Sequence, residues 1–217
     1  MNEIIPSILT TDKETFIQNL NSSMELLDMA QIDIADGEFV PNTTWSYTNP
    51  QEIPELLQTD FSVELHLMVE DPKAVIAEWK SVPQVKRVLV HVEAIDLHEL
   101  LPFIPDNWEL GAVLNPNTPL SAVESVMDIV QSVMFMGVTP GSQGQAFQPQ
   151  VLEHIQTFKK DHPNMPLALD GAVNKDTLQN IITAGVTRVC PGSALFGTED
   201  VKQNLEILQT IIESTNN

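Results

Sequence analysis

The hydrophobic and polar positions of this chain follow two patterns that alternate from one end to the other. Short, nearly continuous apolar runs, such as RVLVHV at 87–92 and VTRVC at 186–190, are typical of strands in a sheet that is covered on both faces. Between these runs, apolar residues recur at the spacing of a helix. The predicted strands cover residues 3–8, 30–34, 61–67, 87–92, 109–114, 131–137, 166–170 and 187–191. The predicted helices cover residues 12–28, 50–58, 71–81, 96–103, 118–129, 149–161, 174–184 and 199–214.

This alternation predicts an α/β fold, and its regularity favours a (β/α)8 TIM barrel. Asp71-Pro72 and Thr118-Pro119 are typical helix starts and support two of the helices. The alternative, an open doubly wound sheet, rarely contains eight such regular units. Because no Gly/Ser linker or low-complexity tract divides the chain, we expect one barrel domain over residues 1–217. In such a barrel, functional side chains lie at the carboxyl ends of the strands.

Polar side chains lie near the ends of several predicted strands, on the face that points into the barrel. In QIDIA, Gln31 and Asp33 share one face, and the two isoleucines face the helices. The same alternation turns His66 inward in ELHLM and Asp170 inward in LALD. Any one of them could be an ordinary hydrogen-bonded core residue. Four polar groups at one mouth favour a functional site, because burying each without a partner is costly.

Composition excludes several classes of partner. The chain has 217 residues, a 42% hydrophobic content that can fill a sizeable core, and a net charge of -20. Such an acidic surface repels nucleic acid and anionic lipid, so we expect neither as a partner. No apolar run is long enough to cross a membrane. The single cysteine, Cys190, lies in an apolar run and indicates no disulfide framework, which favours a cytoplasmic protein.

The positions of the cations indicate how an anion would be bound. Most Lys and Arg residues lie in predicted helices, and Lys86, Arg87 and Arg188 begin strands, at the far end of the barrel. This argues against a Schiff-base lysine and an arginine clamp, and leaves backbone N–H groups and helix dipoles to hold an anion. Glycine-rich turns follow the sixth, seventh and eighth strands, where barrels commonly bind phosphate. These turns contain Gly141, Gly144, Gly171, Gly192 and Ser193.

In combination these motifs resemble the ribulose-phosphate 3-epimerase family. The resemblance runs from PSIL at 6–9 to SALFG at 193–197, and rests on DGEFVPN, ELHLMVEDP, VHVEA, VLNPNTP, TPGSQGQAF, LDGAVN and PGSALF. It implies a (β/α)8 barrel that inverts C3 of a ketose phosphate, converting D-ribulose 5-phosphate into D-xylulose 5-phosphate. The chemistry fits, since epimerisation needs a base on one face of the carbon and an acid on the other.

The resemblance also implies roles for individual residues. Asp33 and Asp170 would be the catalytic acid and base, and with His66 they would bind a divalent metal ion (Zn, Mn or Mg). Gln31 stands where the family has a histidine as fourth ligand, and we include it in the expected metal site. The expected substrate-binding residues are Ser7, His66, Met68, Met136, Gly141, Gly144, Gly171, Ala172, Gly192 and Ser193.

Several positions depart from the family pattern. Ala35 replaces a methionine, Gly137 and Thr139 replace a serine and an asparagine, and Ala172 replaces a glycine. The loop 42–50 looks longer than usual. A glutamine oxygen binds zinc less well than imidazole, so we expect a weak metal site with a shift toward manganese or magnesium. His91 and Glu93 face inward in VHVEA, and we interpret them as polar core contacts.

Two other functions remain compatible with these departures. One is an epimerase of a related ketohexose 6-phosphate, and the other is a non-catalytic sugar-phosphate-binding protein with a degraded metal site. Under each function, the expected partner is a phosphorylated ketose, and the expected assembly is a homo-oligomer.

Overall fold

The computed structural model describes residues 2–141, 144–198 and 200–216. Within these ranges nine strands form one sheet, with the order β1-β9-β8-β7-β6-β5-β4-β3-β2. Every paired strand is parallel to its neighbour. The strands are β1 (Glu3–Ile4), β2 (Ser7–Ile8), β3 (Met29–Ala35), β4 (Ser62–Met68), β5 (Val85–His91), β6 (Glu109–Leu114), β7 (Ser132–Met136), β8 (Leu167–Asp170) and β9 (Arg188–Cys190).

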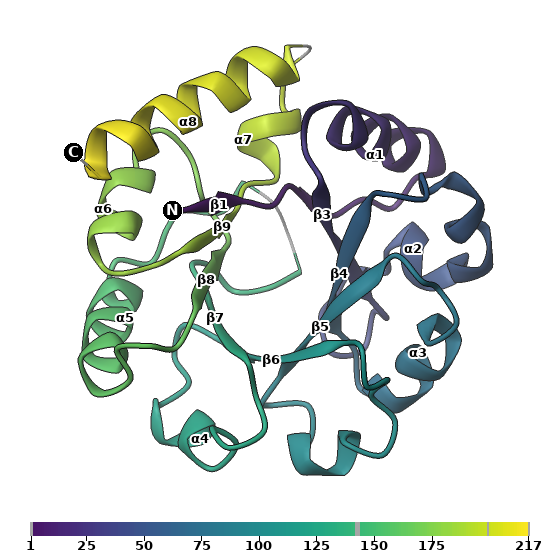
Figure 1. Cartoon of the computed structure of the whole chain (residues 1–217), viewed down its shortest axis with the longest axis horizontal. Helices are drawn as coiled ribbons and strands as arrows, with labels where there is room; N and C mark the ends of the chain where they lie inside the picture. Colours follow the sequence, from purple (N-terminus) through teal and green to yellow (C-terminus); the bar gives the residue numbers. More distant parts are fainter. Residues whose placement is uncertain (1, 142–143, 199, 217) are drawn as a thin grey trace.

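The sheet closes because β1 and β2 are two halves of the predicted first strand. β1 pairs with β9, and β2 pairs with β3. Ser7 N–H donates to Pro191 O at 3.1 Å on one side, and Gln31 N–H donates to Pro6 O at 2.8 Å on the other. Pro6, which has no N–H, interrupts the regular ladder between the halves. The first strand thus joins both edges, and the predicted (β/α)8 barrel is confirmed (Figure 1).

The helices lie outside the ring of strands (Figure 1). They are α1 (Lys13–Leu26), α2 (Trp45–Thr48), α3 (Pro72–Trp79), α4 (Ser121–Glu124), α5 (Gln150–Asp161), α6 (Leu178–Thr183), α7 (Ser193–Phe196) and α8 (Val201–Asn216), with 3-10 turns η1 (Pro50–Glu52), η2 (Pro54–Leu56) and η3 (Leu97–Leu100).

Three predicted helices are much shorter than expected. The stretch 50–58 forms only η1 and η2, because Pro54 lacks the N–H that a continuous helix would need. The stretch 96–103 forms only η3, which ends before Pro102. The stretch 118–129 contains only the four residues of α4. The prediction of one last helix over 199–214 missed α7, which precedes α8.

Alternation along the strands separates two apolar layers. Ile32 and Ile34 of β3 pack with the helices in the large outer core and are fully buried. A smaller core fills the barrel interior. It consists of Ile5, Leu89, Val113, Met134, Met136, Ala168 and Cys190. Gln31 and Asp33, on the other face of β3, therefore point into the interior, as the pattern predicts.

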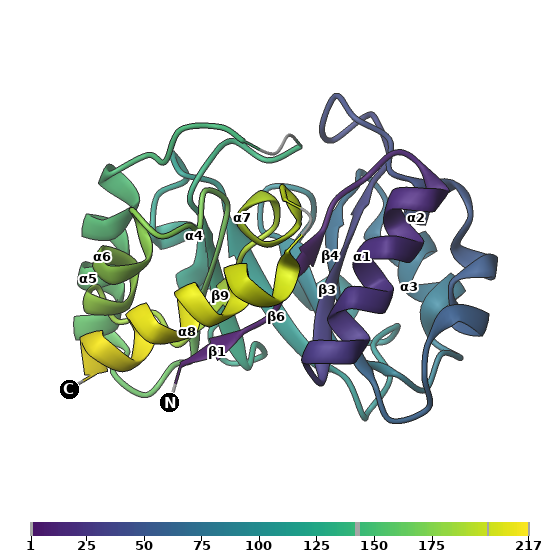
Figure 2. The same cartoon turned by 90° about the horizontal axis from the view of Figure 1, so that it is seen from above.

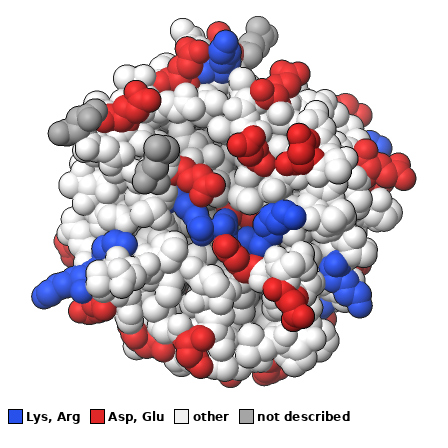
Figure 3. Space-filling model, viewed as in Figure 1, with Lys and Arg blue, Asp and Glu red and all other residues white. Residues whose placement is uncertain are grey.

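The two ends of the barrel differ in character. The loops that follow the strands gather along one edge in Figure 2, whereas the N and C termini lie at the opposite edge. On the face toward the viewer in Figure 1, Lys and Arg side chains gather near the centre (Figure 3). At the amino end of β5, Arg87 forms ion pairs with the buried Glu64 and with Glu109.

Among the described residues, none of the helices has the length and apolar character that crossing a membrane requires.

Candidate active site

A pocket of about 150 Å³ lies at the carboxyl ends of the strands. Most of the substrate-binding residues expected from the sequence line it. They are Ser7, Met68, Met136, Gly141, Gly144, Gly171, Ala172, Gly192 and Ser193. Asp33 and Asp170 also line the pocket. His66 and Gln31 lie beneath the surface, each with 0% exposure.

Two loops meet across the mouth of the pocket. The loop after β3 is anchored at its base, where Thr44 Oγ1 accepts from Ala35 N–H at 3.0 Å and Ser46 Oγ donates to the Asp33 carbonyl oxygen at 2.6 Å. Its tip reaches the loop after β7, because the Asn42 side-chain amide donates to the Gly141 carbonyl oxygen. The expected glycine-rich loop 139–147 is described except for residues 142–143, which lie outside the described residues.

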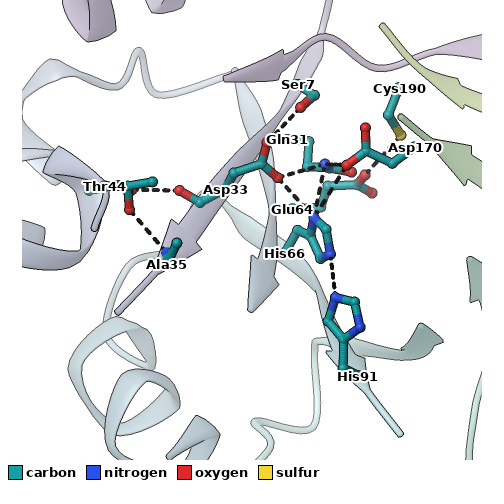
Figure 4. A network of polar contacts seen from close by, with 11 residues as sticks. Ser7, Gln31, Asp33, Ala35, Thr44, Glu64, His66, His91, Asp170 and Cys190 are labelled. Carbon is teal, nitrogen blue, oxygen red and sulfur yellow. Dashed lines mark hydrogen bonds and ion pairs between the residues drawn. The ribbon is translucent and has the colours of Figure 1, made fainter. Parts of the chain in front are cut away.

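Asp33 is the centre of a buried polar cluster (Figure 4). Ser7 Oγ donates to its Oδ2 at 2.6 Å. His66 Nδ1 lies 2.9 Å from its Oδ1 and 3.3 Å from Asp170 Oδ2. The neighbouring strands explain the approach, since Asp33 of β3 and His66 of β4 are register partners and Asp170 ends β8. Residues far apart in sequence are thereby brought to one point.

The Gln31 side-chain amide lies between the two carboxylates of this cluster. Its Nε2 donates to Asp33 Oδ1 at 2.8 Å and to Asp170 Oδ2 at 2.8 Å, and it lies 3.4 Å from His66 Nδ1 (Figure 4). Its other end, Oε1, is buried and has no hydrogen-bond partner among the described residues. Gln31 therefore bridges the two carboxylates with one end and leaves a strong acceptor unused at the other.

The electrostatics of the cluster favour a shared proton or a cation. Burial by itself lowers the pKa of His66, but hydrogen bonds to Asp170 and Asp33 and the charges of these two groups raise that pKa to about 10. Burial, together with the charge of Asp33, raises the pKa of Asp170. The two buried carboxylates thus need positive charge between them, and His66 carries it as an imidazolium in this arrangement.

The same atoms fit a divalent cation. One ligand atom from each of Asp33, His66 and Asp170 lies within 4.8 Å of the others, and all three residues are buried. Two carboxylate oxygens and an imidazole nitrogen are suitable ligands for zinc or manganese. A half turn of the Gln31 amide would bring its unpartnered Oε1 toward the same point. The donor set therefore fits the implied metal ion, with Gln31 as a fourth, weaker ligand.

Backbone N–H groups line the other side of the pocket. In the described part of the chain, the N–H groups of Gly171, Ala172 and Gly192 have no protein acceptor. The residues that line the pocket include no Lys or Arg. Gly171 and Ala172 have φ of 96° and 54°, so this turn follows a left-handed path. Such a turn presents successive N–H groups to an anion, which suits a phosphate.

A feature that the sequence interpretation missed lies behind His66. His66 Nε2 lies 3.0 Å from His91 Nε2, and His91 Nδ1 lies 3.3 Å from Glu93 Oε2. The two imidazole rings are 5.1 Å apart with an angle of 24° between their planes. The i, i+2 spacing of HVE was the available signal, because alternation along an extended backbone carries Glu93, just past the end of β5, to the same side as His91. The sequence alone indicates only polar core contacts for these two residues.

Comparisons with known proteins agree with this architecture. A sequence profile of the ribulose-phosphate 3 epimerase family matches residues 3–196. The ribulose-phosphate 3-epimerase of Bacillus subtilis is 33% identical over 211 residues, covering 94% of this chain and 96% of that protein. The chloroplastic ribulose-5-phosphate-3-epimerase of Arabidopsis thaliana is 32% identical, covering 94% of this chain and 74% of that protein.

Solved structures of more distant proteins share the fold. KGPDC from Streptococcus mutans superposes with a TM-score of 0.75 at 11% identity, covering 99% of this chain and 98% of that chain. Thiamine phosphate pyrophosphorylase from Pyrococcus furiosus gives a TM-score of 0.69 at 17% identity, covering 99% and 97%. At such identities the likeness concerns the fold alone. The family match and the relatives at about one-third identity carry the assignment: this chain belongs to the ribulose-phosphate 3 epimerase family, whose named members are isomerases.

Proposed function

We propose that the chain interconverts D-ribulose 5-phosphate and D-xylulose 5-phosphate, with Asp33 and Asp170 as the acid and the base at C3. One observation carries the proposal. Carboxylates from β3 and β8 converge at the floor of one pocket, with ligand atoms within 4.8 Å of each other. Inversion at carbon needs two such groups, one for each face of the substrate.

The proton transfer follows from the two carboxyl groups. An ionised carboxylate removes the proton from C3, and the electrons of the C–H bond pass into an enediolate. The second carboxyl group, in its protonated form, delivers a proton to the opposite face. Asp170 is suited to hold that proton, since burial and the charge of Asp33 raise its pKa. The Ser7 hydroxyl donates to Asp33 Oδ2 at 2.6 Å and so orients that carboxyl group.

Asp33, His66 and Asp170 hold a divalent cation in this proposal, with the Gln31 amide oxygen as a further ligand. When bound, the cation would stabilise negative charge on the substrate oxygens. Because an amide oxygen binds zinc less strongly than imidazole, the preferred ion is manganese or magnesium, bound weakly.

The substrate phosphate binds to the left-handed turn after β8 and to the Gly192-Ser193 turn after β9. Unpartnered N–H groups and the lack of Lys and Arg in the pocket lining support this placement. Met68 and Met136, which end β4 and β7, line the apolar side of the sugar site. A homo-oligomeric assembly, a cytoplasmic location and the absence of a nucleic-acid partner remain predictions.

Solvent deuterium incorporation at C3 of ribulose 5-phosphate tests the function. We expect exchange and xylulose 5-phosphate formation with the wild type. Asp33→Asn and Asp170→Asn should each lose about 10²- to 10⁴-fold in turnover, the usual cost of removing an acid or base. Asp28→Asn, at the far end of β3, is the matched control and should keep wild-type turnover. Retention of more than about a tenth of the activity by either site variant would contradict the two-base assignment.

The same measurement separates the alternatives. Faster exchange with a ketohexose 6-phosphate than with ribulose 5-phosphate would assign a different substrate to the same chemistry. Binding of ribulose 5-phosphate without exchange in the presence of manganese would identify a non-catalytic binding protein.

A further inference from the structure

We propose that Glu93 and His91 are positioning residues that fix the tautomer of His66, so that its Nδ1 lone pair is offered to a cation between Asp33 and Asp170. The inference rests on the proposed cation site. It concerns two residues outside the proposed set of ligands, and its first evidence is a continuous chain of contacts. Glu93 Oε2 lies 3.3 Å from His91 Nδ1, and His91 Nε2 lies 3.0 Å from His66 Nε2.

Proton counting along this chain selects one arrangement. Two imidazole nitrogens at 3.0 Å share one hydrogen bond, so one of them carries a proton and the other a lone pair. A carboxylate can only accept, so His91 must place a proton on Nδ1 to satisfy Glu93. A neutral His91 then has a lone pair on Nε2 and accepts from His66 Nε2–H. That leaves Nδ1 of His66, the atom that faces both carboxylates, as the ligand atom.

The competing arrangement needs an extra buried charge. If His91 donated from Nε2, it would either turn a lone pair toward Glu93 or carry protons on both nitrogens. His91 is 0% exposed, so an imidazolium there would be costly to bury. The neutral form of His91 satisfies both of its contacts, to Glu93 and to His66.

The contacts from Glu93 through His91 to His66 form a relay, and Glu93, at its far end, is held firmly. Asn115 N–H donates to Glu93 Oε1 at 2.9 Å, and the Thr118 hydroxyl donates to the same oxygen. This leaves the other oxygen, Oε2, directed at His91. The His91 ring is packed against Phe39, with ring centroids 5.0 Å apart. These contacts fix both the position and the rotation of the second imidazole, as a positioning role requires.

The test uses the full-length protein labelled with ¹⁵N-histidine and freed of metal. Ring-nitrogen chemical shifts report which nitrogens carry protons, and His91→Phe assigns the signals of the relay. We expect protons on His91 Nδ1 and on His66 Nε2, a lone pair on His91 Nε2, and, without a metal ion, a second proton on His66 Nδ1, between the two carboxylates. A protonated His91 Nε2, or an unprotonated His66 Nε2, would overturn the proposal. This readout does not depend on metal binding or on activity.

Manganese affinity, measured by titration calorimetry, is the second readout. Glu93→Gln keeps the shape of the side chain and His91→Phe keeps the ring packing, yet each should weaken Mn²⁺ binding about 10- to 100-fold. Glu99→Gln is the matched control, because it makes the same substitution in a surface ion pair with Lys73, outside the relay, and it should change the affinity less than about threefold. Unchanged affinity in both relay variants would also overturn the proposal.

Failure of the relay and failure of the proposed function give different results. Wild-type protein that binds Mn²⁺ with the expected tautomers, yet exchanges no proton at C3, would remove the epimerase assignment and leave the relay standing. Rapid exchange at C3 with the opposite tautomers would do the reverse. If the wild type binds no Mn²⁺, or if a variant fails to fold, the ring-nitrogen shifts of the wild type decide the relay.

Discussion

Gln31 is the residue whose side chain bears most directly on how this site works. Its Nε2 donates to both carboxylates, at the point that the three candidate ligand atoms surround. A cation can enter only if this amide turns and gives up two hydrogen bonds to charged acceptors, each a contact of about 1.5–3 kcal/mol. The amide therefore competes with the cation for the same carboxylates. Without a metal ion, it also holds the two acids close together.

Replacing this amide should strengthen zinc binding. Gln31→His restores an imidazole ligand and removes the competing donor, so we expect zinc affinity to rise by about one to two powers of ten. Gln31→Leu removes the competing donor without offering a ligand, so it shows how much of the gain comes from lost competition, and the histidine variant should bind zinc more tightly than it does. Elemental analysis and zinc titration of the three proteins provide the measurement. Full zinc occupancy of the purified wild type, or no gain with histidine, would mean that position 31 is not a ligand.

The structural elements show which parts of the fold follow from local pattern. The alternation in β3 and β4 correctly predicted which side chains of QIDIA and ELHLM point inward, because one face of each strand is uniformly apolar. The weakly periodic stretches 50–58 and 118–129 were wrongly predicted as full helices, since tertiary packing decides such segments. The contact between His66 and His91 could not be predicted. It depends on the register of β4 and β5, which shifts between Val63 and Glu64.

The turn after β8 is under backbone strain at one residue. Ala172 has φ of 54°, a left-handed conformation that costs an L-residue about 1–2 kcal/mol. Glycine would remove this cost, but its greater conformational entropy would stabilise the unfolded chain by about 0.4–1 kcal/mol. We expect Ala172→Gly to raise the free energy of unfolding by up to about 1 kcal/mol in a denaturant titration. Ala168→Gly, inside β8, should lower it, and a loss in both variants would contradict the strained turn.

The whole molecule carries a net charge of -20. Repulsion among its acidic side chains destabilises the folded state, and the same charge repels an anionic substrate. Raising ionic strength from about 0.01 to about 0.15 M shortens the screening length from about 30 to about 8 Å. We therefore expect the melting temperature to rise over this range and the KM for the sugar phosphate to fall. Calorimetric scans and initial rates measure the two effects, and sucrose at equal osmolality is the control for KM. A KM that rises with salt would indicate that local attraction in the pocket outweighs the net charge.

The ends of the described chain are tied together at the edge of the barrel away from the pocket. Asn216 Nδ2 donates to Asn2 Oδ1 at 2.9 Å, and Asn2 Nδ2 donates to the Val186 carbonyl oxygen at 2.7 Å. β1 pairs with β9, and β2 pairs with β3, so the sheet closes into a ring. The strand–helix units around this ring could therefore follow one another from any starting unit. The chain is thus suited to circular permutation. A short linker between the termini, with new ends opened in a surface loop near the amino ends of the strands, should leave the carboxylate pair in place.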